Sequence, residues 1–226
     1  MPLQLLGFVD LPGHVGQGGF DHAAVHEPTG QVYVAHTAND AIDVIDIEAR
    51  KYVASITGLT AVAGALVAEP DLVFTSNRGE DTVAIFRTGD PTRLDKISVG
   101  IRPNGLAYAP GRGRLLAAHV GDPARPGSYT VSVLDIQARQ RILDIPVAGR
   151  TRWAVYDPVA DAFHVNIADP PQIVVVGAGD PVGILRVVKV PRAGPHGLDI
   201  DIERRQLFAP AMRASCSWST PIAARS

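Results

Sequence analysis

The chain has 226 residues, of which 46% are hydrophobic and 19% are charged, a composition that supports a packed core and excludes a disordered chain. Lys and Arg together number 21 and Asp and Glu 23, so the formal net charge is −2, which excludes a general attraction to nucleic acid or to an anionic membrane surface. The single cysteine, Cys216, excludes an internal disulfide and a cysteine-based zinc site.

The first 20 residues are predicted to form a leading strand and a link. Met1–Asp10 contains no basic residue and its apolar stretch is confined to Leu5–Val9, so neither a signal peptide nor a membrane span is expected. We therefore expect a cytoplasmic protein. The apolar character of Leu5–Leu11 predicts a strand.

From residue 21 onward the chain repeats. Five similar apolar passages are aligned on His22, Ala63, Asn104, Arg152 and His196, with spacings of 41, 41, 48 and 44 residues. Repetition at this period is typical of a propeller or another repeat architecture.

Each complete repeat contains four short runs rich in Val and Ile, bounded by Gly, Pro, Asn or Asp, as expected for strands. Four strands in about 42 residues indicate an all-β β-propeller. We predict one propeller domain over 1–226 with about four complete blades and a partial fifth; the boundaries are 1–20 for the leading strand and link, 21–62, 63–102, 103–150 and 151–194 for the blades, 195–208 for the partial blade and 209–226 for an aberrant tail.

The repeats resemble the YVTN family of β-propeller proteins. The residues that carry the resemblance are Val32-Tyr-Val-Ala-His36, Val73-Phe-Thr-Ser-Asn77, Asp81-Thr-Val-Ala-Ile85 and Thr130-Val-Ser-Val-Leu-Asp135. The resemblance covers about residues 20–208 and implies blades of a seven-bladed ring, relative to which this chain is incomplete. In such rings a leading strand completes the last blade.

Two sets of polar residues are predicted to lie on one face of the propeller, and they are the candidate ligand-binding residues. The links before the first strands carry His22, Asn104, Arg152 and His196, and the second strands end at His36, Asn77, His119 and Asn166. A structural alternative stays open for both sets, because Asn and His at strand ends also bond the following turn. Proximity to Arg152 is expected to disfavour protonation of His22 and His196.

No catalytic constellation, metal site or cofactor is predicted. Imidazoles can bind transition metals, but the aligned positions supply His, Asn and Arg rather than the acidic ligands of metal-dependent lactonase propellers. The glycine-rich segment Ile173–Gly183 is interpreted as a hairpin between strands, since a dinucleotide loop would continue into a helix. Asp43, Asp46 and Asp135 are interpreted as residues that end the third strands and begin turns.

The sequence favours a non-catalytic propeller that binds a small molecule or protein partner on its polar face, although the ligand is unknown. A lactonase-like hydrolase and an inactive remnant are the alternatives. Residues 209–226 lack β alternation, and codons can be chosen so that another reading frame restores a turn and a third strand. We therefore expect a frameshift truncation with a poorly packed tail, which leaves self-association through edge strands open.

Overall fold

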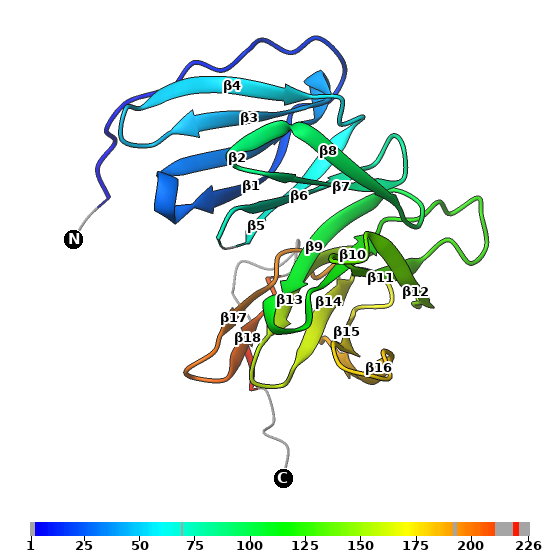
Figure 1. Cartoon of the computed structure of the whole chain (residues 1–226). Coiled ribbons are helices and arrows are strands. Elements are labelled where there is room, and N and C mark those ends of the chain that lie inside the picture. Colours follow the sequence, from blue (N-terminus) through cyan, green and yellow to red (C-terminus); the bar gives the residue numbers. More distant parts are fainter. Residues whose placement is uncertain (1–2, 69, 192–193, 211–218, 222–226) are drawn as a thin grey trace.

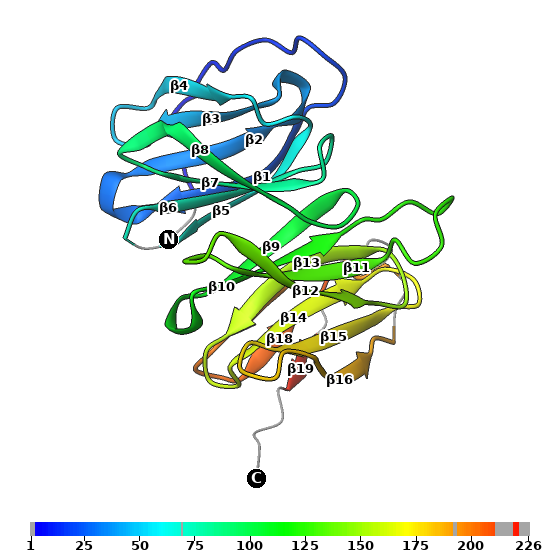
Figure 2. The same ribbon diagram turned by 45° about the vertical axis from the view of Figure 1, so that its right-hand side comes forward.

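A computed structural model describes residues 3–68, 70–191, 194–210 and 219–221. These residues form five antiparallel sheets that follow one another along the chain in an arc (Figures 1 and 2). Four sheets have four strands and the fifth has three. The predicted all-β class and the succession of four complete blades and a partial fifth are confirmed.

The strands of blades one and two match the predicted runs to within a few residues. Blade one contains β1 (Phe20–His26), β2 (Gln31–His36), β3 (Ala41–Asp46) and β4 (Lys51–Thr57). Blade two contains β5 (Val62–Ala68), β6 (Leu72–Asn77), β7 (Thr82–Arg87) and β8 (Asp90–Ser98).

The remaining blades continue the same order. Blade three contains β9 (Pro103–Ala109), β10 (Arg114–His119), β11 (Thr130–Asp135) and β12 (Gln140–Pro146). Blade four contains β13 (Thr151–Asp157), β14 (Ala162–Ile167), β15 (Gln172–Gly177) and β16 (Ile184–Lys189). The fifth sheet contains β17 (Asp199–Asp201), β18 (Gln206–Phe208) and β19 (Ser219–Pro221).

The first strand of each complete blade is the innermost one, because β1 packs beside β5, β5 beside β9 and β9 beside β13. Second strands are almost continuously buried because their side chains alternate between two neighbouring blades. Val73 faces blade one and Phe74 faces blade three, and Leu115 and Leu116 likewise face blades two and four. This double burial explains the unbroken apolar runs in the sequence.

One prediction about local structure is confirmed. Residues 178–183 connect β15 to β16 as a hairpin. The third repeat is longer than the others because the link between β10 and β11, residues 120–129, is extended; it is the long green loop in Figure 1.

One other prediction is wrong. Residues 5–11 pair with no strand, and the side chains of Leu5, Leu6 and Phe8 are largely exposed. A strand needs a sheet edge that offers its backbone groups partners, and here Leu6 O accepts a hydrogen bond from the Arg50 side chain and not from a neighbouring strand. The tail contributes β19, which pairs with β18; residues 211–218 and 222–226 lie outside the described residues, so the expected poor packing of 209–226 stays a prediction.

No helix in the described part of the chain has the length and apolar character of a membrane span.

Candidate functional site

An irregular pairing at the start of each inner strand sets the geometry of the site. Between Phe20 and Ala23, β1 places two residues opposite one residue of β2, and β13 does the same between Thr151 and Ala154. Such a bulge redirects side chains and ends regular pairing. The inner strands therefore present polar side chains at one end of the central channel, which we call the mouth.

The pairing corrects the alignment of blade one by one residue. Equivalent mouth positions hold Asp21, Ala63, Asn104, Arg152 and His196. The next position inward holds His22, Gly64, Gly105, Trp153 and Gly197. His22 therefore lies one residue deeper than predicted, and Asp21 takes the place assigned to it.

Arg78 connects blades one, two and three at the mouth. It begins the link after β6, and its Nη2 atom lies 3.0 Å from Asp21 Oδ2 and donates to Asn104 Oδ1. Burial lowers the pKa of Arg78, and Asp21 acts in the opposite direction; the guanidinium stays charged. Asp21 and Asn104 are thus bridged by one cation.

Arg152 brings a second positive charge to the mouth. No described carboxylate lies within ion-pair distance of it, and its buried Nε has no hydrogen-bond partner among the described residues. Burial lowers the pKa of Arg152, and the positive charges of Arg150 and Arg78 lower it further. Arg152 therefore lies near two further guanidinium groups, and among these arginines Arg78 forms an ion pair with Asp21.

His196 lies at the same mouth and is half-buried. Burial lowers its pKa, followed by the positive charge of Arg152, while Asp21 raises it. Its backbone is fixed on both sides, since its carbonyl accepts from Trp153 N and its N–H donates to Pro210 O. The backbone thus holds the imidazole beside Arg152.

His22 and Trp153 stack on each other although they belong to blades one and four. Their ring centroids are 3.9 Å apart, with an interplanar angle of 37°. His22 Nε2 lies 3.5 Å from Asp21 Oδ1. Burial lowers the pKa of His22 to about 4, with smaller contributions from Arg78 and His196 in the same direction and Asp21 opposing. The expected resistance to protonation is thus present, and burial rather than like charge is its main cause.

The candidates at the ends of the second strands are not brought to the mouth. His36 is fully buried, and its Nδ1 lies 2.7 Å from Asp43 Oδ2. His119 is also fully buried, and its Nδ1 lies 2.7 Å from Thr130 Oγ1. Both imidazoles bond a side chain of the third strand of their own blade. This is a structural role, although the bonds do not go to the following turn as the alternative supposed.

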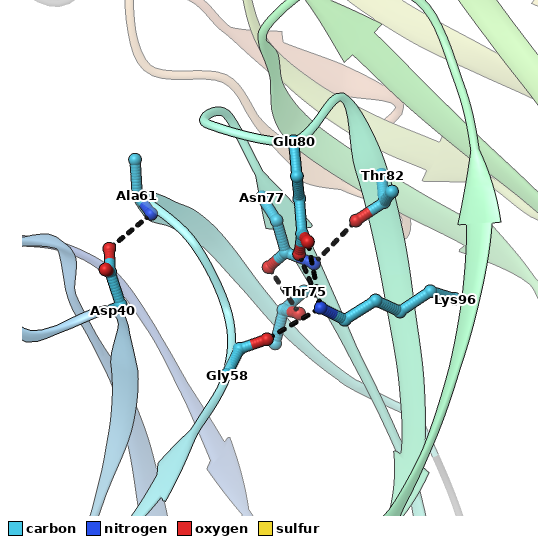
Figure 3. A network of polar contacts seen from close by, with 8 residues as sticks. All are labelled: Asp40, Gly58, Ala61, Thr75, Asn77, Glu80, Thr82 and Lys96. Carbon is cyan, nitrogen blue, oxygen red and sulfur yellow. Dashed lines mark hydrogen bonds and ion pairs between the residues drawn. The ribbon is translucent and has the colours of Figure 1, made fainter.

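The two asparagines of this set are buried as well. Asn77 donates to Thr82 Oγ1 and accepts from Thr75 Oγ1, inside blade two (Figure 3). Asn166 Nδ2 donates to the carbonyls of His196 and Gly197 at 3.3 and 2.7 Å. Asn166 therefore holds the segment that carries His196 in place, but the Asn166 side chain itself does not face the mouth.

One interpretation of the aspartates is also corrected. Asp43 lies inside β3, is fully buried, and accepts from Ser55 Oγ at 2.6 Å as well as contacting His36. It ends no strand. Asp46 and Asp135 do begin turns, because their side chains accept from Ala49 N and Ala138 N.

Sequence reasoning missed Asp21, Arg78 and Arg150 as mouth residues. Each is within two positions of a predicted candidate, so the signal was present. Arg78 directly follows Asn77, Arg150 precedes Arg152 by two residues, and Asp21 precedes His22. Charged neighbours of a predicted mouth residue could have been included on that ground.

The described residues contain no group of three or more His, Cys, Asp or Glu side chains positioned to hold a metal ion. The mouth instead offers guanidinium donors, an amide and two imidazoles. This donor set suits an anion, because guanidinium groups match carboxylate and phosphate geometry.

The fold defines the class of this protein as a β-propeller. No family model matches the sequence and no curated protein does. Among solved structures, hydrazine synthase of Kuenenia stuttgartiensis is similar with a TM-score of 0.74 and 11% identity, covering 87% of this chain and 57% of that one.

A second similar structure is the dihydro-heme d1 dehydrogenase NirN in complex with DHE. Its TM-score is 0.67 and its identity 16%, and the match covers 86% of this chain and 42% of that one. The chain thus spans roughly half the length of both proteins. At these identities the likeness shows the fold and nothing finer.

Proposed function

We propose that this protein is a non-catalytic propeller that binds a small anionic molecule, bearing carboxylate or phosphate groups, at the mouth of its channel. The observation that carries the proposal is the positive charge at the mouth: Arg78 bridges Asp21 and Asn104. Arg152 has a buried Nε without a hydrogen-bond partner among the described residues, and its pKa is lowered by Arg150 and Arg78. The whole chain has a net charge of −2, so this positive charge is local. A rigid scaffold with variable links is a common basis for binding sites.

The roles of the mouth residues follow from their surroundings. Arg152 has donors to offer a ligand, whereas Arg78 is already engaged by Asp21 and Asn104. His22 and His196 have lowered pKa values, so near neutral pH they add hydrogen-bonding groups rather than charge. Arg152 is therefore the principal anchor in this proposal.

Titration calorimetry with inorganic phosphate and with citrate tests the proposal. Arg152→Ala should weaken binding at least about tenfold, since a hydrogen bond to a charged group contributes about 1.5–3 kcal/mol. Arg204→Ala is the control, because Arg204 is exposed and pairs with Asp201 away from the mouth. Failure of both anions to bind, or equal binding by the two variants, would contradict the proposal. Binding only to an acidic protein would also contradict it and favour a protein partner.

A lactonase-like hydrolase is the second candidate, and one observation favours it. His22 and His196, with their lowered pKa values, lie beside cationic side chains, an arrangement in which a neutral imidazole could accept a proton and an arginine could hold an oxyanion. The names of the two similar structures are those of enzymes. Lactone hydrolysis, measured with and without a divalent cation, tests this candidate; hydrolysis abolished by His196→Ala would support it.

We also propose that the blades are of the YVTN type. The support is the recurrence of second strands with Asn at or next to their last residue, Asn77 in β6 and Asn166 in β14, and of third strands such as Thr130–Asp135. We propose separately that the protein is cytoplasmic. Immunodetection in separated cell fractions tests the location.

A further inference from the structure

A cavity of about 610 Å³ lies along the inner strands of all five sheets. Its lining includes residues from the second halves of β5, β9 and β13 and from the turns that follow, such as Pro110, Pro158 and Ile202. These turns lie at the opposite end of the inner strands from the mouth. We call this cavity the chamber; its volume falls within the usual range of about 300–1,000 Å³ for small-molecule sites.

The lining of the chamber is apolar and carries no Asp, Glu, Lys or Arg among the described residues. Most of the wall is made of Ala, Val, Leu and Ile, and the aromatic side chains are Tyr108, Tyr156 and Trp153. A charged ligand group that left water without finding a partner in the wall would lose roughly several kcal/mol of hydration free energy. The chamber therefore suits an uncharged molecule.

The end of the chamber nearest the mouth is occupied by the stacked rings of His22 and Trp153. Both residues occupy the position at which blades two and three have Gly64 and Gly105. A Cβ atom at either glycine would lie 2.4 Å from a backbone oxygen of the next blade, so that position is normally confined to glycine. An indole at this position is a departure from the repeat, and it gives the chamber an aromatic wall.

We propose that the chamber is a second binding site, distinct from the mouth, that takes a flat, uncharged aromatic molecule. The faces of Trp153, Tyr108 and Tyr156 provide offset or edge-to-face packing. Because the wall carries no charged side chain, it disfavours an anionic ligand. The volume of the chamber limits the ligand to a small molecule. This site goes beyond the anion site of the proposed function and does not depend on it.

The test uses N-phenyl-1-naphthylamine, an uncharged fluorophore whose emission rises in apolar surroundings. Wild-type protein should enhance its emission saturably, and methyl 2-naphthoate should displace it at least about tenfold better than 2-naphthoate, since the carboxylate would lose its hydration. Absence of enhancement, or equal displacement by the ester and the acid, would overturn the proposal.

Two matched variants on β1 locate the probe. Ala23 lines the chamber, so Ala23→Trp should fill it and weaken probe binding at least about tenfold. Val25 is on the same strand, 53% exposed and outside the lining, so Val25→Trp should bind the probe as the wild type does. Equal binding by the two variants would overturn the proposal. The phosphate affinity of both variants is measured as well, because it tests the anion site at the mouth independently of the chamber.

Discussion

The imidazole of His22 and the indole of Trp153 pack against each other at a centroid distance of 3.9 Å, tilted by 37°, across three blade boundaries of the arc. The two residues occupy the same position in blades one and four. The blades between them have Gly64 and Gly105 at that position, where a Cβ atom would lie 2.4 Å from a backbone oxygen of the next blade. The stack separates a polar mouth from an apolar chamber.

Replacing Trp153 by glycine, the residue that blades two and three have at this position, should destabilise the protein. Trp153 is half-buried and packs against the core between blades four and five, so we expect a loss of about 2 kcal/mol, below the 3–5 kcal/mol of fully buried aromatics. Urea unfolding measures the loss. Trp153→Phe should retain most of the stability, and a loss equal to that of the glycine variant would argue against ring packing.

Stability should fall as the pH is lowered from about 6.5 to about 4. Burial lowers the pKa of His22, His119 and His164 to about 4 each, whereas the unfolded chain binds these protons at about 6.5. The unfolded state therefore takes up protons first, and each histidine removes about 2 kcal/mol of stability by pH 5. Above about pH 6.5 this contribution is fully present.

Urea unfolding at pH 7.5 and pH 5.0 checks this dependence. His119→Asn introduces the residue that blade two has at the end of its second strand, Asn77. This variant should lose less stability between the two pH values than the wild type does. Equal stability of the wild-type protein at both values would contradict the prediction.

Regular features of this fold were predictable because they follow from local patterns. Runs such as Thr130–Asp135 combine Val and Leu with a turn-forming Asp, and they became strands with almost the expected bounds. The repeat length predicted four-stranded blades. Burial of His36 and His119 was not predictable from composition, because the same strand-end position could face solvent or a neighbouring strand.

The error in blade one has a definite cause. Aligning His22 with Asn104 places Pro28 opposite Pro110, but Pro28 is the second residue of its turn, Glu27–Thr29, whereas Pro110 is the first of Pro110–Arg112. This one-residue difference displaced His22. The ion pair between Arg78 and Asp21 could not be predicted for another reason. The links of different blades come together only after the blades have packed.

Removing the carboxylate of Asp43 should destabilise blade one strongly. Asp43→Ala leaves His36 Nδ1 and Ser55 Oγ without their common partner in a buried site, at a cost of about 3–5 kcal/mol. Asp46→Ala is the control on the same strand, since it loses a bond from Ala49 N at an exposed turn, worth about 1 kcal/mol. Equal unfolding free energies for the two variants would contradict the role assigned to Asp43.

Adding one methyl group at Gly105 should disturb both the core and the mouth. A Cβ atom there would lie 2.4 Å from Arg152 O and 3.1 Å from Ala154 N, so β9 would have to move away from β13. Overpacking of this kind costs about 1–3 kcal/mol. Because Asn104 and Arg152 lie on these two strands, Gly105→Ala should also weaken phosphate binding at the proposed site.

Gly111→Ala is the matched control for that substitution, because a Cβ atom at Gly111 would meet nothing within 4 Å. Its unfolding free energy should stay within about 0.5 kcal/mol of the wild-type value, and its phosphate affinity should be unchanged. Thermal unfolding and calorimetry on the three proteins measure both quantities. If Gly105→Ala is as stable as Gly111→Ala, the inner strands are not held at the close approach that positions Asn104 beside Arg78, and the geometry of the mouth would have to be revised.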